Sequence, residues 1–204
     1  MNTLHNIFQI PVAECNVDKS IIDEVLKDSE AFISKHNWNQ KDSLGRTITS
    51  YYVDSSDRNF LGEIGAYSLL DFLNYEIRNF LQIIGYDETI NIKIESWLNL
   101  NLKNTTHNQH EHFGAIASGV VYLKAGKNSG NIVFPDPIRE RVITNNYNWR
   151  SVTNETAYNK QLYVFTPTSG KCLLFESWLP HFVNANENTE PRISVSFNAF
   201  NAED

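Results

Sequence analysis

Three of the chain's six histidines fall within six residues, in the stretch HNQHEH at 107–112. His110 and His112 are two positions apart, so both imidazoles project to the same side if this segment is extended. A further histidine, His181, follows a long apolar stretch much later in the chain. Three imidazoles on one face of a metal ion would leave its opposite positions open to other ligands. The plainer alternative is a solvated, histidine-rich loop and an unrelated structural His181.

A second group of residues that could bind a ligand lies on the last apolar alternation, RISVSFNAFN at 192–201. Arg192 and Ser194 share the polar face of this predicted strand, and Arg192 follows His181 by only 11 residues. A guanidinium fork beside a hydroxyl group is a good receptor for a carboxylate. Taken alone, such a polar face is more often an ordinary sheet surface in water. Its closeness in sequence to His181 favours a binding site.

The elements that must position these groups change type near residue 90. Before it, apolar residues recur with a period close to 3.6 in two stretches, 17–38 and 60–87, which predicts two helices. Asp18 is the expected N-cap of the first helix, and Gly85 ends the second. After residue 90 the period becomes 2, which predicts strands. The strand candidates are 90–102, 115–124, 131–134, 141–145, 160–166, 171–176 and 192–200.

Helices followed by about seven strands indicate a fold of the α+β class that is mainly β. The expected arrangement is an antiparallel sheet or barrel with the N-terminal helices packed on one face. We expect one domain over 1–204, with a helical part at 1–89 and a β core at 90–204. The stretch 136–160, rich in Asn, Arg and Tyr, is expected to be an insertion or lid.

Composition restricts the kind of protein. Hydrophobic residues make up 41% of the 204 residues, and the formal net charge is −7 with no block of Lys and Arg. This balance disfavours nucleic acid and anionic membranes as main partners. No apolar run is long enough to cross a membrane, the N-terminal stretch lacks the features of a signal peptide, and two cysteines are too few for a disulfide framework. We therefore expect a cytoplasmic protein.

Several short motifs occur in a set order along the chain. Each is weak alone, but the ordered set resembles the Fe(II)/2-oxoglutarate-dependent oxygenases, and more narrowly a group of bacterial and phage members of that superfamily. Together the motifs span nearly the whole chain. They are IFQIPV at 7–12, HEH at 110–112, SGVVYL at 118–123, SGNIVFPDP at 129–137, FESWLPHFV at 175–183 and RISVSFN at 192–198.

This resemblance implies a double-stranded β-helix, the cupin-like fold also called a jelly roll. It implies Fe(II) as the metal and 2-oxoglutarate as the cosubstrate, with hydroxylation of an unidentified substrate and release of succinate and CO2. By the resemblance, His110 and His181 match two metal-ligating histidines. Arg192 with Ser194 matches the pair that binds the C5 carboxylate of 2-oxoglutarate. His112 stands where the superfamily usually has Asp or Glu, so a third histidine ligand departs from the usual pattern.

Other polar residues of the predicted strands complete the predicted site. Tyr122 and Asn101, with Asn99, are expected to line the mouth of the barrel and to contact the cosubstrate. The alternative is that they only fill the interior of a small barrel. His107 is expected to be solvated or to lie behind the metal ligands.

Three alternatives stay open on the sequence. Asp136 or Glu111 could serve as the third metal ligand in place of His112. The protein could be a three-histidine dioxygenase of the cupin type that does not use 2-oxoglutarate. It could also be a jelly-roll binding protein without catalytic activity. The substrate could be a small molecule or a peptide, and a homodimer is compatible with the fold.

Overall fold

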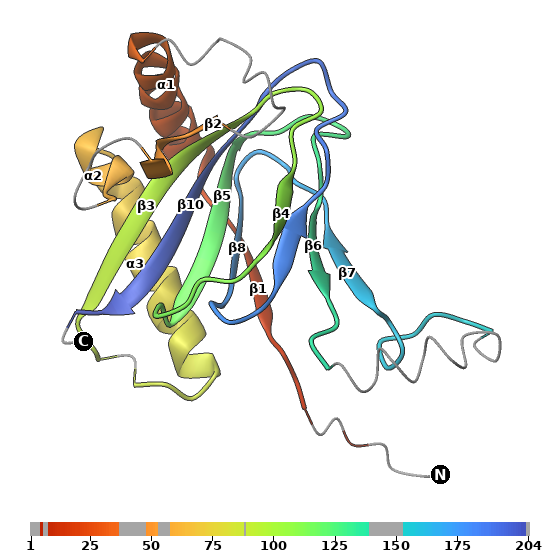
Figure 1. Cartoon of the computed structure of the whole chain (residues 1–204). Coiled ribbons are helices and arrows are strands. Elements are labelled where there is room, and N and C mark those ends of the chain that lie inside the picture. The colour runs from red at the N-terminus through yellow and green to blue at the C-terminus, as the bar shows by residue number, and fades with distance from the viewer. Residues whose placement is uncertain are drawn as a thin grey trace.

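Two antiparallel β-sheets face each other, and helices cover the outer face of the larger sheet (Figure 1). The structure is a computed structural model that describes residues 5, 8–36, 48–52, 58–87, 89–138 and 153–202. Paired strands are mostly distant in sequence, and chain segments cross repeatedly between the two sheets. This is a double-stranded β-helix of the α+β class, mainly β, so the predicted fold is confirmed.

The larger sheet has the strand order β1-β8-β5-β10-β3-β2, and the smaller sheet has the order β4-β9-β6-β7. Every pairing between named strands is antiparallel. The strands of the larger sheet are β1 (Val12–Asn16), β2 (Ile48–Thr49), β3 (Ile92–Asn101), β5 (Ala117–Lys124), β8 (Lys171–Glu176) and β10 (Arg192–Asn201). Those of the smaller sheet are β4 (His107–His110), β6 (Ile132–Pro135), β7 (Leu162–Phe165) and β9 (His181–Val183).

The helices are α1 (Lys19–Lys35), α2 (Phe60–Glu63) and α3 (Tyr67–Ile83), with a 3₁₀ turn at Ser50–Tyr52. Asp18 occupies the N-cap position of α1 as predicted, but its side chain makes no capping hydrogen bond. Within the described residues, no helix is both long and apolar enough to span a membrane.

The second predicted helix is two helices in the structure. Gly65 lies between α2 and α3 with a φ of +72°, a conformation that favours glycine and ends α2. Gly85 follows α3 with a φ of +85°, as expected for a residue that ends a helix. Strands β1 and β2 were not among the predicted strands. The predicted strand 141–145 and most of the predicted lid lie outside the described residues.

The central strands of the larger sheet are buried on both faces. One face packs against α1 and α3, in a cluster that includes Leu69, Leu73, Ile77, Leu98, Val121, Leu174, Val195 and Phe197. The other face looks toward the smaller sheet, where Tyr122 and Phe175 pack with Phe134. Each fully buried apolar side chain of this size contributes about 1.5–3 kcal/mol. The helices therefore stabilise the sheet from one side and leave its other side for the site.

Gly119, in the SGVVYL motif, is buried where β5 lies between β8 and β10. A Cβ atom added there would clash with the ring of Phe197 and with the carbonyl oxygen of Leu173. Because that oxygen belongs to the backbone of β8, the sheet itself would have to move. We expect Gly119→Ala to lower the free energy of unfolding by about 2–3 kcal/mol, measured by denaturant titration.

Gly126→Ala is the matched control. Gly126 is exposed just after β5, and an added Cβ atom would meet the movable amide end of Asn188 at 2.6 Å. We expect its free energy of unfolding to change by no more than about 0.5 kcal/mol. Equal losses in the two variants would show that close packing at Gly119 is not the cause.

Candidate metal centre

Three imidazole rings converge between the two sheets. The donor atoms of His110, His112 and His181 all lie within 4.8 Å of one another. Ring centroids are 4.9 Å apart for His110 and His112, 4.3 Å for His110 and His181, and 5.2 Å for His112 and His181. In the part of the chain that the structure describes, no carboxylate or thiol joins this group. The structure thus brings together the three predicted histidines, in an arrangement that can hold one metal ion.

The pairing of β4 with β9 positions two of these rings. His110 and His181 lie directly opposite each other in the register of the two strands. The Nδ1 atom of His181 donates to the carbonyl oxygen of Leu179 at 2.9 Å, and that of His110 donates to the carbonyl oxygen of Asn108 at 2.8 Å. Because a carbonyl oxygen can only accept, each Nδ1 carries the hydrogen. The Nε2 lone pair of both rings is then the one that can bind a metal.

His112 lies just after β4 and is held by its backbone. Its N–H group donates to the carbonyl oxygen of Ser177 at 2.9 Å, and its ring lies 5.9 Å from that of Trp97. The buried hydroxyl of Ser177 is 2.9 Å from the hydroxyl of Ser118, which lies 2.8 Å from the Oδ1 atom of Asn198. These buried hydrogen bonds hold the turn after β8 in place. Because the backbone of His112 is bonded to this turn, they also fix the position of His112.

Burial keeps the imidazoles of His112 and His181 neutral. His181 is only 4% exposed and packs against Phe175 and Phe134, at ring distances of 4.8 and 5.8 Å. Burial lowers the pKa of His181 to about 3, and nearby His110 adds to the effect. Burial also lowers the pKa of His112 to about 4. Both rings are therefore neutral near pH 7, which is the form of imidazole that binds a metal.

The three histidines line a small cavity of about 60 Å³, and a buried cation lines it with them. Arg192, at the start of β10, is 2% exposed. Its Nη1 atom donates to the carbonyl oxygens of Ser129 and Gly130 at 3.1 and 2.7 Å, while its Nε atom has no partner. Among the described residues, no carboxylate lies within ion-pair distance of it. Burial lowers the pKa of Arg192, yet a guanidinium keeps its charge at neutral pH.

The other residues predicted to bind the cosubstrate surround Arg192. Ser194 and Tyr122 face each other across β10 and β5, and both line the cavity. The ring centroid of Tyr122 is 5.9 Å from the guanidinium carbon of Arg192. Burial raises the pKa of Tyr122 to about 12, so its phenol stays neutral and can donate a hydrogen bond. Asn101 is not among the residues that line the cavity, and its amide lies 3.0 Å from Nε2 of His107, which does line it.

Two further cavity residues are His107 and Asn99. His107 was expected to be solvated or behind the ligands, but its ring borders the cavity, and burial lowers its pKa to about 3. A spacing of three would normally put His107 and His110 on opposite faces of a strand. An irregularity in the register of β4 between these two residues brings both to the same side. Asn99 was on the predicted polar face, and its amide donates to Ser196 at 2.9 Å.

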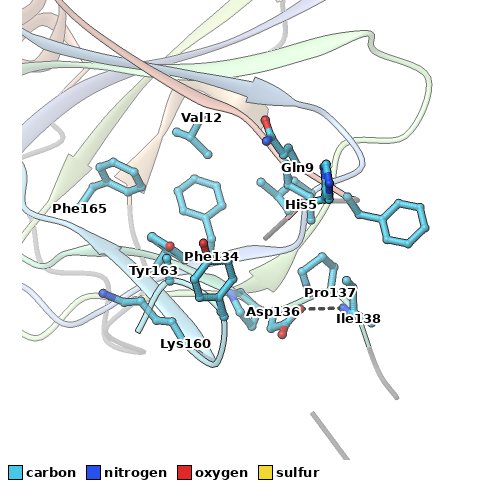
Figure 2. Close-up of a pocket in the computed structure, with 16 residues that line it drawn as sticks. His5, Gln9, Val12, Phe134, Asp136, Pro137, Ile138, Lys160, Tyr163 and Phe165 are labelled. Carbon is cyan, nitrogen blue, oxygen red and sulfur yellow. Dashed lines mark hydrogen bonds between the residues drawn. The ribbon is translucent and has the colours of Figure 1, made fainter. Parts of the chain in front are cut away.

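Neither alternative carboxylate belongs to the histidine group. Glu111 is exposed between His110 and His112. Asp136 lines a separate, larger cavity of about 620 Å³, where its side chain accepts a hydrogen bond from the N–H group of Ile138 at 3.0 Å (Figure 2). His112 is therefore the third member of the group in this structure.

The fold is a double-stranded β-helix, and its three histidines and a buried guanidinium line one cavity. This combination is typical of metal-dependent oxygenases. Residues 95–198, about half of the chain, match the family described as "Putative 2OG-Fe(II) oxygenase". The chain belongs to this family of 2-oxoglutarate-dependent, Fe(II)-dependent oxygenases. It is thus an oxidoreductase whose cofactors are Fe(II) and 2-oxoglutarate.

Solved structures show the same fold at low sequence identity. A prolyl-4-hydroxylase from Pseudomonas putida has a TM-score of 0.56 and 13% identity, over 94% of this chain and 92% of that one. The carbocyclase SnoK from nogalamycin biosynthesis has a TM-score of 0.61 and 11% identity, over 95% and 80%. The epimerase SnoN, solved with Fe³⁺, α-ketoglutarate and nogalamycin RO, has a TM-score of 0.60 and 13% identity, over 95% and 80%. No curated protein sequence matches the chain.

Loss of one ring from the group should remove iron binding. We expect His181→Ala to weaken Fe(II) binding by about 100-fold or more, because a buried nitrogen ligand with a fixed tautomer is lost. Anaerobic calorimetric titration of the metal-free protein with Fe(II) measures this change.

His107→Ala is the control, because it removes a buried ring from the same cavity but not from the group of three. Its Fe(II) affinity should stay within about threefold of the wild type. If His107→Ala and His181→Ala weakened binding equally, the three histidines would not be the metal site.

Proposed function

We propose that the enzyme hydroxylates a C–H bond of its substrate, with His110, His112 and His181 as iron ligands and Arg192 as the anchor of 2-oxoglutarate. One atom of O2 enters the substrate and the other enters succinate, while CO2 leaves the cosubstrate. The observation that carries the proposal is the buried guanidinium of Arg192. It shares one cavity with the three imidazoles and has no acidic partner among the described residues.

The residues present fit both groups. Three imidazoles offer nitrogen donors of the kind that bind Fe(II). The Nε atom of Arg192 is a buried donor without an acceptor, which a carboxylate would satisfy. Bound Fe(II) and 2-oxoglutarate supply the oxidising chemistry. The chain's own residues bind these groups, orient them and keep water out.

Five cavity residues then have a defined task. Arg192 and Ser194 hold the far carboxylate, the guanidinium through paired N–H groups and Ser194 through its hydroxyl. Tyr122 donates a hydrogen bond without changing the charge, because its phenol stays protonated. His110 and His181 keep their hydrogens on Nδ1, so their Nε2 atoms stay ready to bind the metal.

The primary substrate must lie largely outside the cavity of about 60 Å³, because the metal and the cosubstrate would leave it no room there. A cytoplasmic location is part of the proposal. The free thiols of Cys15 and Cys172, directly opposite each other on β1 and β8, support it.

Arg192→Ala should separate cosubstrate binding from metal binding. We expect 2-oxoglutarate affinity to fall about 10- to 100-fold, the loss of a charge-assisted hydrogen bond, while Fe(II) affinity is unchanged. The visible charge-transfer band that 2-oxoglutarate gives on anaerobic Fe(II) protein measures the cosubstrate step, and calorimetric titration with Fe(II) measures the metal step.

Arg192→Lys is the matched variant, since it keeps the charge and loses the paired geometry. Its affinity for 2-oxoglutarate should lie between those of the wild type and Arg192→Ala. Unchanged affinity in Arg192→Ala would remove the anchoring role. Hydroxylation itself is tested once a substrate is found, by incorporation of ¹⁸O from labelled O2 into both the product and succinate.

A further inference from the structure

Strand β7 forms one edge of the smaller sheet and, among the described residues, pairs only with β6. The outer edge of such a strand carries backbone N–H and C=O groups that are ready to pair with another strand. Proteins usually protect these edges with proline, lysine or a covering segment. The four residues of β7, LYVF, include neither proline nor lysine.

Register shows which backbone groups face the open edge. The N–H group of Asp136 donates to the carbonyl oxygen of Gln161 at 2.8 Å, so these residues form a hydrogen-bonded pair. In an antiparallel ladder such pairs alternate with pairs that are not hydrogen-bonded. The next pair is Pro135 with Leu162, and proline has no N–H group to donate. Leu162 and, two residues on, Val164 therefore turn their N–H and C=O groups away from β6.

Both faces of β7 expose apolar side chains. Leu162 and Val164 are 46% and 47% exposed on the outer face, and Tyr163 is 45% exposed on the inner face. Tyr163 and Phe165 line the large cavity (Figure 2). A small molecule in that cavity would cover Tyr163 but not the residues of the opposite face. A strand paired with the edge would cover both faces, because its side chains alternate.

The large cavity also adjoins the metal centre. Its volume of about 620 Å³ lies within the range of ligand pockets. Phe134 in its wall has its ring 5.8 Å from that of His181, and Leu179 in its wall accepts the hydrogen bond from Nδ1 of His181. The ammonium of Lys160, which also lines the cavity, is paired with Glu155 at 3.3 Å. The cavity thus offers mainly aromatic and apolar contact, one side chain away from His181.

We infer that the primary substrate is a polypeptide that binds in extended form along the open edge of β7 and carries side chains into this cavity. The inference rests on the proposed oxygenase function and names the class of its substrate. A strand at this edge lies about three strand spacings, roughly 14 Å, from β9. Its paired residues therefore serve for docking. The oxidised residue belongs to the part of the peptide that runs on across the cavity toward His181.

The test selects random dodecapeptides displayed on phage against the full chain, kept anaerobic with Fe(II) and 2-oxoglutarate. Enriched peptides are then synthesised, and their dissociation constants are measured for the wild type, Val164→Pro and Val164→Thr. Val164→Pro removes the outward N–H group and breaks no bond to β6. Val164→Thr keeps that N–H group and the branched shape. We expect Val164→Pro to weaken binding about tenfold or more and Val164→Thr to leave it within about twofold.

Amide hydrogen exchange reports the position of the bound peptide. In the free protein, the amide hydrogens of Leu162 and Val164 should exchange fast, and those of Tyr163 and Phe165, bonded to β6, should exchange slowly. Bound peptide should protect Leu162 and Val164 and leave the other two unchanged.

Three results would overturn the inference: no enriched peptide, equal affinity for Val164→Pro and the wild type, or protection of Leu162 and Val164 without peptide. In the last case another part of the chain, or a second copy, covers the edge. Exchange at several protein concentrations tells these two apart. The charge-transfer band of the same samples shows that Val164→Pro is folded. If the wild type gave no charge-transfer band, that would count against the proposed function. The peptide inference would still be tested, since peptide binding is measured without turnover.

Discussion

The burial of β10 on both faces is the constraint on which the site depends. One face packs Val195 and Phe197 against the helices, and the other directs Arg192 and Ser194 into the space between the sheets. Because side chains alternate along a strand, a shift of one residue in register would exchange the two faces. It would place a guanidinium in the apolar core and apolar rings in the cavity. The packing of helices that never touch the site therefore fixes where an anion can bind.

Burial then sets the electrostatics of the cavity. Arg192 keeps its charge, and its Nη1 atom donates to two backbone carbonyl oxygens. Enclosing a charge without a counter-ion is unfavourable, and a bound carboxylate relieves that penalty. A ligand that binds only the folded chain also stabilises it. The same burial lowers the pKa values of His112 and His181, so among the described residues that line the cavity it is Arg192 that carries a permanent charge.

The sequence predicted the parts of the site that depend on residue type and alternation. His110 was expected from the H-x-H pattern. Arg192 was expected from the polar face of the strand that begins 11 residues after His181. His107 was expected to be solvated or behind the ligands; its ring borders the cavity because an irregularity in β4, which the sequence does not show, brings it to the side of His110. Asn101 shares the polar face of β3 with Asn99, yet its amide is hydrogen-bonded to His107, and Asn101 does not line the cavity. Alternation gives the face of a strand, but tertiary contacts decide which groups on that face reach the cavity.

A histidine at position 112 changes what has to hold the metal centre together. In the proposed arrangement, a divalent metal and Arg192 present three positive charges, and no carboxylate of the described residues joins the histidine group to offset them. A dianionic cosubstrate is attracted more strongly than it would be with Asp at this position, because low dielectric strengthens such interactions. His112 itself gains no charge attraction to the metal and lies outside the strands that fix His110 and His181. Its placement depends on its backbone bond to Ser177 and on the buried hydroxyl of Ser118 beneath that turn. Hydrogen bonding at the turn after β8 thus holds His112 in place, whereas an Asp at this position would also be held by its charge attraction to the metal.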